Sequence, residues 1–96
     1  MPDAYPEQNP RAAWRVYEGE AVIVSPEDST LHTLNSVGTV IWEAADGRTA
    51  MEAIIGRVCD AFEVDRATAA RDAAGFVESL CRRGLLTLLD TPRPAA

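Results

Sequence analysis

The chain has 96 residues, of which 47% are hydrophobic and 25% are charged, a composition typical of one small globular domain. Its net charge of −6 comes from 15 acidic residues against 9 basic ones. A protein that binds the phosphate backbone of a nucleic acid needs a basic surface, so this composition argues against a nucleic-acid partner.

The sequence shows no sign of a membrane segment. No apolar stretch approaches the roughly 20 residues that a membrane-spanning helix needs, and the polar start of the chain has no signal-peptide core. We therefore expect a cytoplasmic protein without a membrane partner. A reducing compartment argues against a disulfide between Cys59 and Cys81, and their spacing is not that of a metal or redox pair. Both cysteines are expected to be core or half-buried residues.

The first half of the chain predicts strands. Residues 1–13 contain scattered prolines among polar residues and are expected to form a flexible arm. Residues 14–17 alternate with period two, residues 21–24 are rich in β-branched side chains, and residues 30–34 form a short third strand. Gly19 suits a tight turn between the first two of these strands. The pattern predicts a three-stranded β-meander.

At Asn35 the apolar spacing changes to that of a helix. Asn35 is a good N-cap because its side chain can accept a hydrogen bond from a free amide of the first turn. This helix is predicted to continue to about Ala45 and to end at Asp46-Gly47. Gly38 weakens a helix by about 1 kcal/mol relative to alanine, and close packing against another element would explain its presence.

A second helix is predicted to begin at Thr49, which forms a capping box with Glu52. Asp65 is the predicted N-cap of a third helix that runs to about Arg83 and stops at Gly84. The predicted core contains the large apolar residues of all three helices: Trp42, Ile54, Ile55, Phe62, Phe76 and Leu80.

The last part of the chain has two segments. Residues 85–89 are apolar and predict a short strand or extended segment. Residues 90–96 contain prolines and are expected to form a flexible tail. The single domain therefore spans residues 14–89.

The residue types needed for catalysis or metal binding are sparse. The chain has one histidine and no glycine-rich phosphate loop, so we expect no enzymatic activity, no metal site and no cofactor. His32 precedes Leu34 by two positions, so both should point to the same face of the sheet. A partly buried histidine that packs like an aromatic ring is favoured over a general base.

The face of the third helix opposite its core stripe has small residues in the middle and charged residues at both ends. Such a surface could form a shallow trough for the side chains of a partner, with arginines placed to meet carboxylates. An Ala-rich helix without a binding role is the alternative. The residues of this face are Arg71, Ala74, Gly75, Glu78 and Arg82.

The predicted order of elements, with Leu34-Asn35 at the junction of strands and helices, resembles the PqqD-like family, also called RiPP recognition elements. The resemblance covers residues 14–89 and implies an α+β, winged-helix-like fold with an N-terminal three-stranded meander followed by three helices. Its other matching features, in chain order, are Trp42, Asp46-Gly47, Thr49, Ile54, Phe62, Asp72, Phe76, Leu80 and Gly84-Leu85.

The resemblance also implies a function. Such domains hold the leader of a ribosomally synthesised precursor peptide and present it to a modifying enzyme, often a radical SAM protein. The leader would pair with the edge of the third strand, so that main-chain hydrogen bonds give affinity and side-chain pockets give specificity. The implied peptide-binding residues are Thr30, Leu31, His32, Thr33 and Leu34 of the strand, and Arg71, Ala74, Gly75, Glu78 and Arg82 of the third helix.

Two other classes of protein remain as alternatives. A winged-helix DNA-binding regulator shares the order of elements but needs a basic recognition helix, whereas the third helix here mixes arginines with carboxylates. A small enzyme is disfavoured because no nucleophile–base pair or metal-ligand set is evident. The sequence therefore favours a peptide-binding adaptor.

Overall fold

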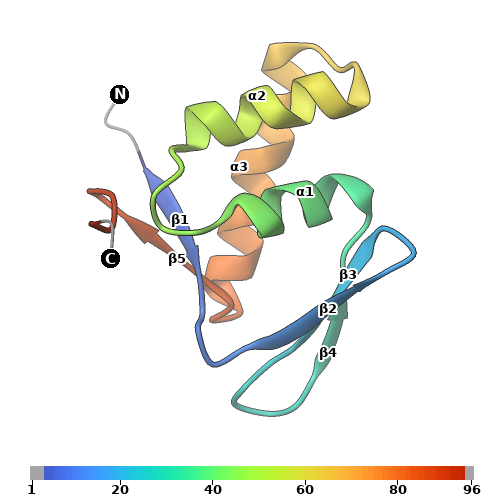
Figure 1. The fold of residues 1–96 in the computed structure, drawn as a ribbon, viewed down its shortest axis with the longest axis vertical. Helices are drawn as coiled ribbons and strands as arrows, with labels where there is room; N and C mark the ends of the chain where they lie inside the picture. Colours follow the sequence, from blue (N-terminus) through green and yellow to red (C-terminus); the bar gives the residue numbers. More distant parts are fainter. Residues whose placement is uncertain (1–3, 95–96) are drawn as a thin grey trace.

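The computed structural model describes residues 4–94. In Figure 1 the helices fill the top and centre of the molecule, with one small antiparallel sheet at the left and the other at the lower right. The predicted α+β class, with strands followed by helices, is confirmed. The elements in chain order are β1 (Tyr5–Gln8), β2 (Ala13–Tyr17), β3 (Glu20–Val24), β4 (Leu31–Thr33), α1 (Ser36–Ala44), α2 (Met51–Phe62), α3 (Arg66–Arg82) and β5 (Leu86–Leu89).

Strands β2, β3 and β4 form the predicted meander, in that order across the sheet. The loop between β2 and β3 consists of Glu18 and Gly19, whose φ angles are 52° and 82°. Two positive φ angles suit a two-residue hairpin loop, because its twist then matches that of the strands. In the register of the sheet, Ile23 lies between Trp14 on β2 and His32 on β4.

A second sheet forms where a flexible arm was expected. Residues 5–8 form β1, which pairs antiparallel with β5 from the other end of the domain. Pro6 is buried in this sheet, and its carbonyl accepts a hydrogen bond from the Gly47 amide at 2.9 Å. The predicted arm of residues 1–13 therefore contains a strand, as well as the start of β2 at Ala13.

The expected flexible tail is also attached to the domain, through Arg93. Its guanidinium donates to the two carboxylate oxygens of Glu7, at 2.6 and 2.9 Å. Its backbone amide donates to the carbonyl of Gly47 at 2.8 Å. The hydrogen bond from Arg93 holds the pKa of the Glu7 carboxyl below its ordinary value.

This pair makes stability depend on pH. Because the pKa of Glu7 is lowered on folding, the pair stabilises the fold above the ordinary value of 4.5, and its contribution is lost as the pH falls through the folded-state pKa. We expect Arg93→Gln to lower the thermal unfolding midpoint at pH 7 and to have little effect once Glu7 is protonated. Thermal melts of the wild type and the variant between pH 7 and a pH below 4.5 test the prediction. An equal decrease of the unfolding midpoint at every pH would contradict it.

Two of the three predicted helix starts are confirmed. The side chain of Asn35 accepts a hydrogen bond from the Gly38 amide at 2.8 Å and so caps α1. The side chain of Asp65 caps α3 in the same way, accepting from the Thr68 amide at 2.7 Å. Gly84 follows α3 with a φ of 75°, as expected of a glycine that ends a helix.

The predicted capping box of α2 is wrong. The N-cap is Ala50, which makes no side-chain hydrogen bond, and the amide of Thr49 donates instead to the Asp46 carboxylate at 2.8 Å. Asp46 also accepts from the Arg48 amide. Burial alone would raise the pKa of the Asp46 carboxyl, but these hydrogen bonds together outweigh it and hold the pKa below its ordinary value. An acidic side chain two residues after α1 therefore fixes the α1–α2 loop, and Thr49 is not free to cap the helix.

The core lies where the helices meet β3 and β5. Trp42, Ile54, Ile55 and Leu80 are buried, as predicted. Phe62 and Phe76 are only half-buried and pack against the margin of the core.

Cys59 and Cys81 are free and half-buried, in agreement with the sequence analysis, and burial raises the pKa of the Cys81 thiol. Within residues 4–94, no helix has both the length and the apolar character needed to cross a bilayer.

Candidate functional site

Strand β4 is an edge strand of the three-stranded sheet, as the sequence predicted. On one side it pairs with β3, and the pairing continues just beyond both ends of the strand. The Leu34 amide donates to the Ala21 carbonyl at 2.8 Å, and the Ser25 amide donates to the Thr30 carbonyl at 2.9 Å. Its other side has no strand neighbour within residues 4–94.

The bonded pairs show which backbone groups of β4 face the open side. In an antiparallel ladder, hydrogen-bonded pairs alternate with non-hydrogen-bonded ones. Because Thr30 and Leu34 belong to bonded pairs, His32 between them does too, and the backbone groups of all three point toward β3. Those of Leu31 and Thr33 therefore point to the open side. The edge offers two N–H donors and two C=O acceptors to an additional strand.

Side chains of β4 alternate between the two faces of the sheet. Leu34 is buried and His32 is half-buried on the face toward the helices, so the prediction that they share a face is confirmed. Leu31 points to the opposite face and is 65% exposed.

The outer face of this sheet has its own shallow depression of about 490 Å³. Tyr17 and Leu31 are the most exposed large apolar side chains there. The lining residues are Ala13, Trp14, Arg15, Tyr17, Val22, Val24 and Leu31.

Two side chains connect α3 to the other elements of the site: Phe76 within the helix and Arg83, the residue that follows its last turn. The Arg83 guanidinium lies 3.2 Å from Nδ1 of His32 on β4. The Phe76 ring packs on α1, where a Cβ added to Gly38 would lie 2.7 Å from Cε1 of the ring. Positions seven residues apart share a helix face, so the face that looks toward β4 and α1 runs from Phe76 to Arg83.

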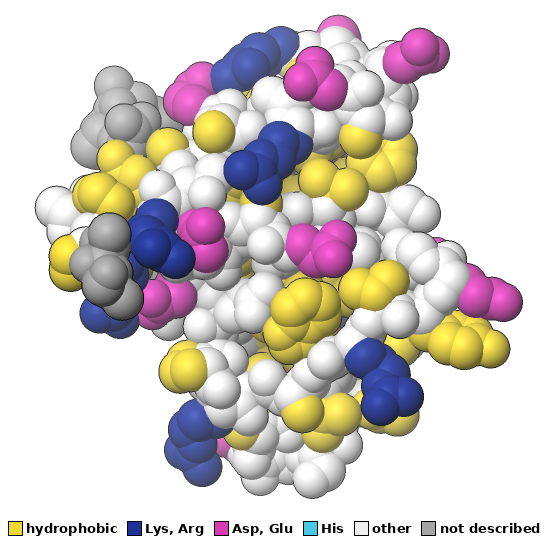
Figure 2. Space-filling model, viewed as in Figure 1, with side chains coloured by type: hydrophobic (Ala, Val, Ile, Leu, Met, Phe, Trp, Pro, Cys, Tyr) yellow, Lys and Arg dark blue, Asp and Glu magenta, His cyan; other side chains and the backbone are white. Residues whose placement is uncertain are grey.

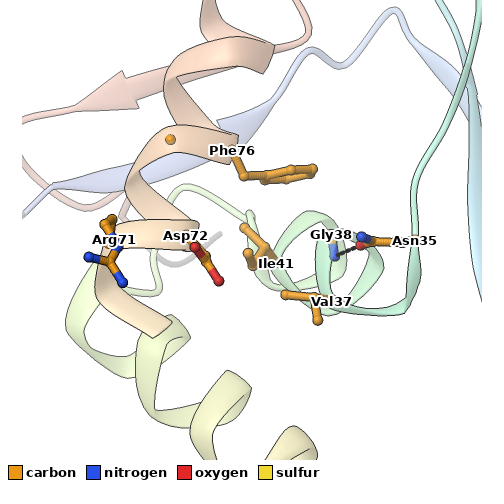
Figure 3. A pocket seen from close by; sticks show the side chains of 8 residues that line it. Asn35, Val37, Gly38, Ile41, Arg71, Asp72 and Phe76 are labelled. Carbon is orange, nitrogen blue, oxygen red and sulfur yellow. Dashed lines mark hydrogen bonds between the residues drawn. The ribbon is translucent and has the colours of Figure 1, made fainter. Parts of the chain in front are cut away.

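A depression of about 410 Å³ lies between α1 and α3, next to the end of β4. Figure 3 shows Asp72 and Phe76 pointing from α3 toward α1, whereas Arg71 points away from α1. In the space-filling view, hydrophobic side chains are exposed in the middle of this face of the molecule, with charged side chains around them (Figure 2). The lining residues are Asn35, Val37, Gly38, Ile41, Arg71, Asp72, Gly75 and Phe76.

The helix residues predicted for the site do not form one wall. Arg71 and Gly75 line the depression between α1 and α3. Ala74 and Glu78 line a different depression, of about 470 Å³, between α2, α3 and β5. Arg82 is exposed and pairs with Glu78 at 3.2 Å.

Sequence reasoning missed Asp72, Phe76 and Arg83 as residues that face β4 and α1. One step along an α-helix rotates the side chain by about 100°, so a stripe displaced by one residue faces a different neighbour. The helical spacing of Phe76 predicts a core position, whereas the structure leaves its ring half-buried against α1. The glycine at position 38 was the available signal, since it implied close packing by a large side chain on α1.

Gly38 and Gly75 form a matched pair for testing this packing. A Cβ at Gly75 would meet no atom within 4 Å, so Gly75→Ala should stabilise the protein by up to about 1 kcal/mol through helix propensity alone. Gly38→Ala would displace the Phe76 ring, which costs about 1–3 kcal/mol and cancels that gain. Urea unfolding measures both, and equal stabilisation by the two substitutions would contradict the packing described.

Within residues 4–94, no group of three or more His, Cys, Asp or Glu side chains is arranged to hold a metal ion. The features that the site does offer are an open strand edge and a depression lined by apolar side chains together with the charged Arg71 and Asp72.

A comparison of the sequence with known protein families gives a match over most of the domain. Residues 20–86 match the family described as Coenzyme PQQ synthesis protein D (PqqD). The chain belongs to the PqqD family. The resemblance stated from the sequence is thereby confirmed. No curated protein matches the chain.

Two solved structures resemble this PqqD-family protein. TbiB1 in complex with the TbiA(beta) leader peptide is 26% identical, with a TM-score of 0.76 over 83% of this chain and 93% of TbiB1. Lasso peptide synthetase B1 complexed with the leader peptide has a TM-score of 0.72 over 85% of this chain and 96% of its own. Its identity is 20%, so this second likeness concerns the fold alone.

Proposed function

We propose that this PqqD-family protein binds an extended leader peptide along the open side of β4 and presents it to a modifying enzyme. The observation that carries the proposal is the open edge of β4 beside the depression between α1 and α3. The complex of TbiB1 with the TbiA(beta) leader peptide supports it.

The physical basis is strand addition. Backbone groups of Leu31 and Thr33 would bond to the peptide, while alternate peptide side chains would point toward the depression between α1 and α3, which we call the proposed groove. The half-buried ring of Phe76 and the side chains of Val37 and Ile41 make part of that groove apolar. Ordering a flexible peptide costs roughly 2–5 kcal/mol, so we expect a micromolar affinity, about −8 kcal/mol.

The proposed site keeps residues 30–34 and two of the predicted helix residues, Arg71 and Gly75. To these it adds Asp72, Phe76 and Arg83, which face β4 and α1. Ala74, Glu78 and Arg82 lie on another part of α3 and are left outside the proposed groove.

The protein would act without catalysing a reaction itself, and its partner would be the enzyme that modifies the precursor. A radical SAM enzyme is the partner that we propose, in keeping with the family. Co-purification of the full chain with a radical SAM enzyme encoded beside it would test this part, and separate elution of the two in the presence of the peptide would count against it.

A DNA-binding role is not favoured. Two arginines of α3 that a recognition helix would need are paired with carboxylates: Arg66 with Glu52 and Arg82 with Glu78. The net charge of −6 would also repel the DNA backbone.

The test is a selection. The full chain is immobilised and exposed to an mRNA-display library of random 15-residue peptides, and enriched peptides are then measured by fluorescence anisotropy. We expect micromolar binding by a subset with a shared pattern, and only weak, non-specific binding of random duplex DNA at low salt. A selection that enriches no peptide, or tight sequence-dependent binding of DNA, would contradict the proposal.

A further inference from the structure

Arg83 contacts β4 through its side chain, unlike Arg66 and Arg82, which pair with carboxylates. Arg71, the other arginine of the proposed site, lines the depression between α1 and α3 and, like Arg83, forms no ion pair with residues 4–94. The guanidinium of Arg83 forms no ion pair with any of residues 4–94, and it contacts the imidazole of His32 at 3.2 Å. An exposed cation is thus held beside β4 by an imidazole and not by a carboxylate.

The chemistry of the two groups fixes the direction of this hydrogen bond. An arginine side chain can only donate, so Nδ1 of His32 accepts and the ring hydrogen is on Nε2. The imidazole thus positions the guanidinium without neutralising it, and its own Nε2–H remains a donor. The guanidinium of Arg83 and the Nε2–H of His32 are both hydrogen-bond donors, so together they are suited to bind a carboxylate.

The register of an added strand places one peptide residue near both groups. Because the backbone of His32 bonds to β3, an antiparallel strand on the open side would meet His32 in a non-hydrogen-bonded pair. In such a pair the Cα atoms are about 4.5 Å apart, and the side chains point to the same face. The peptide side chain opposite His32 would therefore point toward Arg83.

We propose that the leader carries an aspartate or glutamate opposite His32, and that Arg83 and His32 bind its carboxylate. The inference rests on the proposed strand addition to β4 and defines the class of peptide that the site selects. Arg83 is the specificity-determining residue, and His32 positions it.

The position of Phe76 adds a second element to the peptide pattern. It precedes Arg83 by seven residues, which is about 10 Å along a helix axis and corresponds to about three residues of an extended strand. Every second residue of an extended peptide would face the helices. A peptide paired antiparallel to β4 would run from the end of β4 nearest α1 toward His32, so it would pass Phe76 before it reaches Arg83. We therefore expect a large apolar residue two or four positions before the acidic one.

The experiment repeats the peptide-display selection with the wild-type chain, Arg83→Glu and Arg83→Gln. Wild type should enrich Asp or Glu at one position, with an apolar residue two or four positions earlier. This result would be informative because the net charge of −6 disfavours acidic peptides in general. Arg83→Glu should enrich Lys or Arg at the same position, and Arg83→Gln should lose the preference.

Arg82→Gln is the matched control. It removes the neighbouring arginine, which pairs with Glu78 away from β4, so it should keep the wild-type preference. For one enriched peptide, changing its Glu to Gln should weaken binding to wild type about tenfold and leave binding to Arg83→Gln unchanged. Thermal melts confirm that each variant is folded.

The outcomes separate this inference from the proposed function. If peptides are enriched and compete for the β4 edge but show no acidic preference, and Arg83→Glu selects the same peptides as wild type, the carboxylate proposal is wrong while peptide binding stands. If none of the proteins enriches any peptide, strand addition itself is wrong, and the proposal falls with it.

Discussion

Replacing both Leu31 and Thr33 with proline should weaken peptide binding about thirtyfold or more, because two main-chain hydrogen bonds worth about 1 kcal/mol each are lost. The amides of these two residues face the open side of β4, so the ladder with β3 does not use them. The protein should therefore stay folded. Fluorescence anisotropy with an enriched peptide measures the loss, and circular dichroism measures the fold.

The matched control replaces the same two residues with alanine. This variant keeps both amides and removes the side chains, so most of the affinity should remain. His32→Pro is a second comparison, because the His32 amide bonds to β3 and its loss should destabilise the sheet. Unchanged affinity in the double-proline variant, with the fold intact, would mean that the peptide does not pair with β4.

Replacing Trp42 with alanine should destabilise the protein by about 3–5 kcal/mol, the cost of removing a buried aromatic side chain. Trp42 has 0% exposure, and its ring meets Trp14 edge to face with centroids 5.9 Å apart. It thus joins α1 to the sheet that carries the proposed peptide edge. A domain of this size has a total stability of about 5–15 kcal/mol, so the variant should be close to unfolding.

Trp42→Phe is the control for this prediction. The indole Nε1 of Trp42 is buried without a hydrogen-bond partner among residues 4–94, so phenylalanine removes an unsatisfied donor and keeps most of the ring. Its cost should be less than half that of alanine. Urea unfolding followed by circular dichroism compares the two, and a loss below 1 kcal/mol for Trp42→Ala would contradict the central place of this side chain in the core.

Features encoded by neighbouring residues could be predicted from the sequence. The meander follows from period-two strands and the turn at Glu18-Gly19, and the caps of α1 and α3 follow from Asn35 and Asp65. In each case the residues that determine the structure lie within a few positions of one another. The edge position of β4 also follows from the order of consecutive strands.

Features that depend on distant partners could not be predicted in the same way. Strand β1 contains Pro6, lacks a regular apolar alternation, and is fixed by pairing with β5 at the far end of the chain. Thr49 matched the spacing of a capping box, but Asp46 competes for the same amide. On α3, alanine-rich composition left the face toward β4 ambiguous, and only the contacts of Phe76 and Arg83 identify it.

Amide chemical shifts during titration with an enriched peptide test the central claim most directly. Strand addition to β4 predicts the largest shifts at residues 31–34, with further shifts at Gly38, Gly75 and Phe76 around the depression between α1 and α3. Shifts confined to β1, β5 and the depression lined by Ala74 would contradict it, because they would place the peptide on the opposite side of α3.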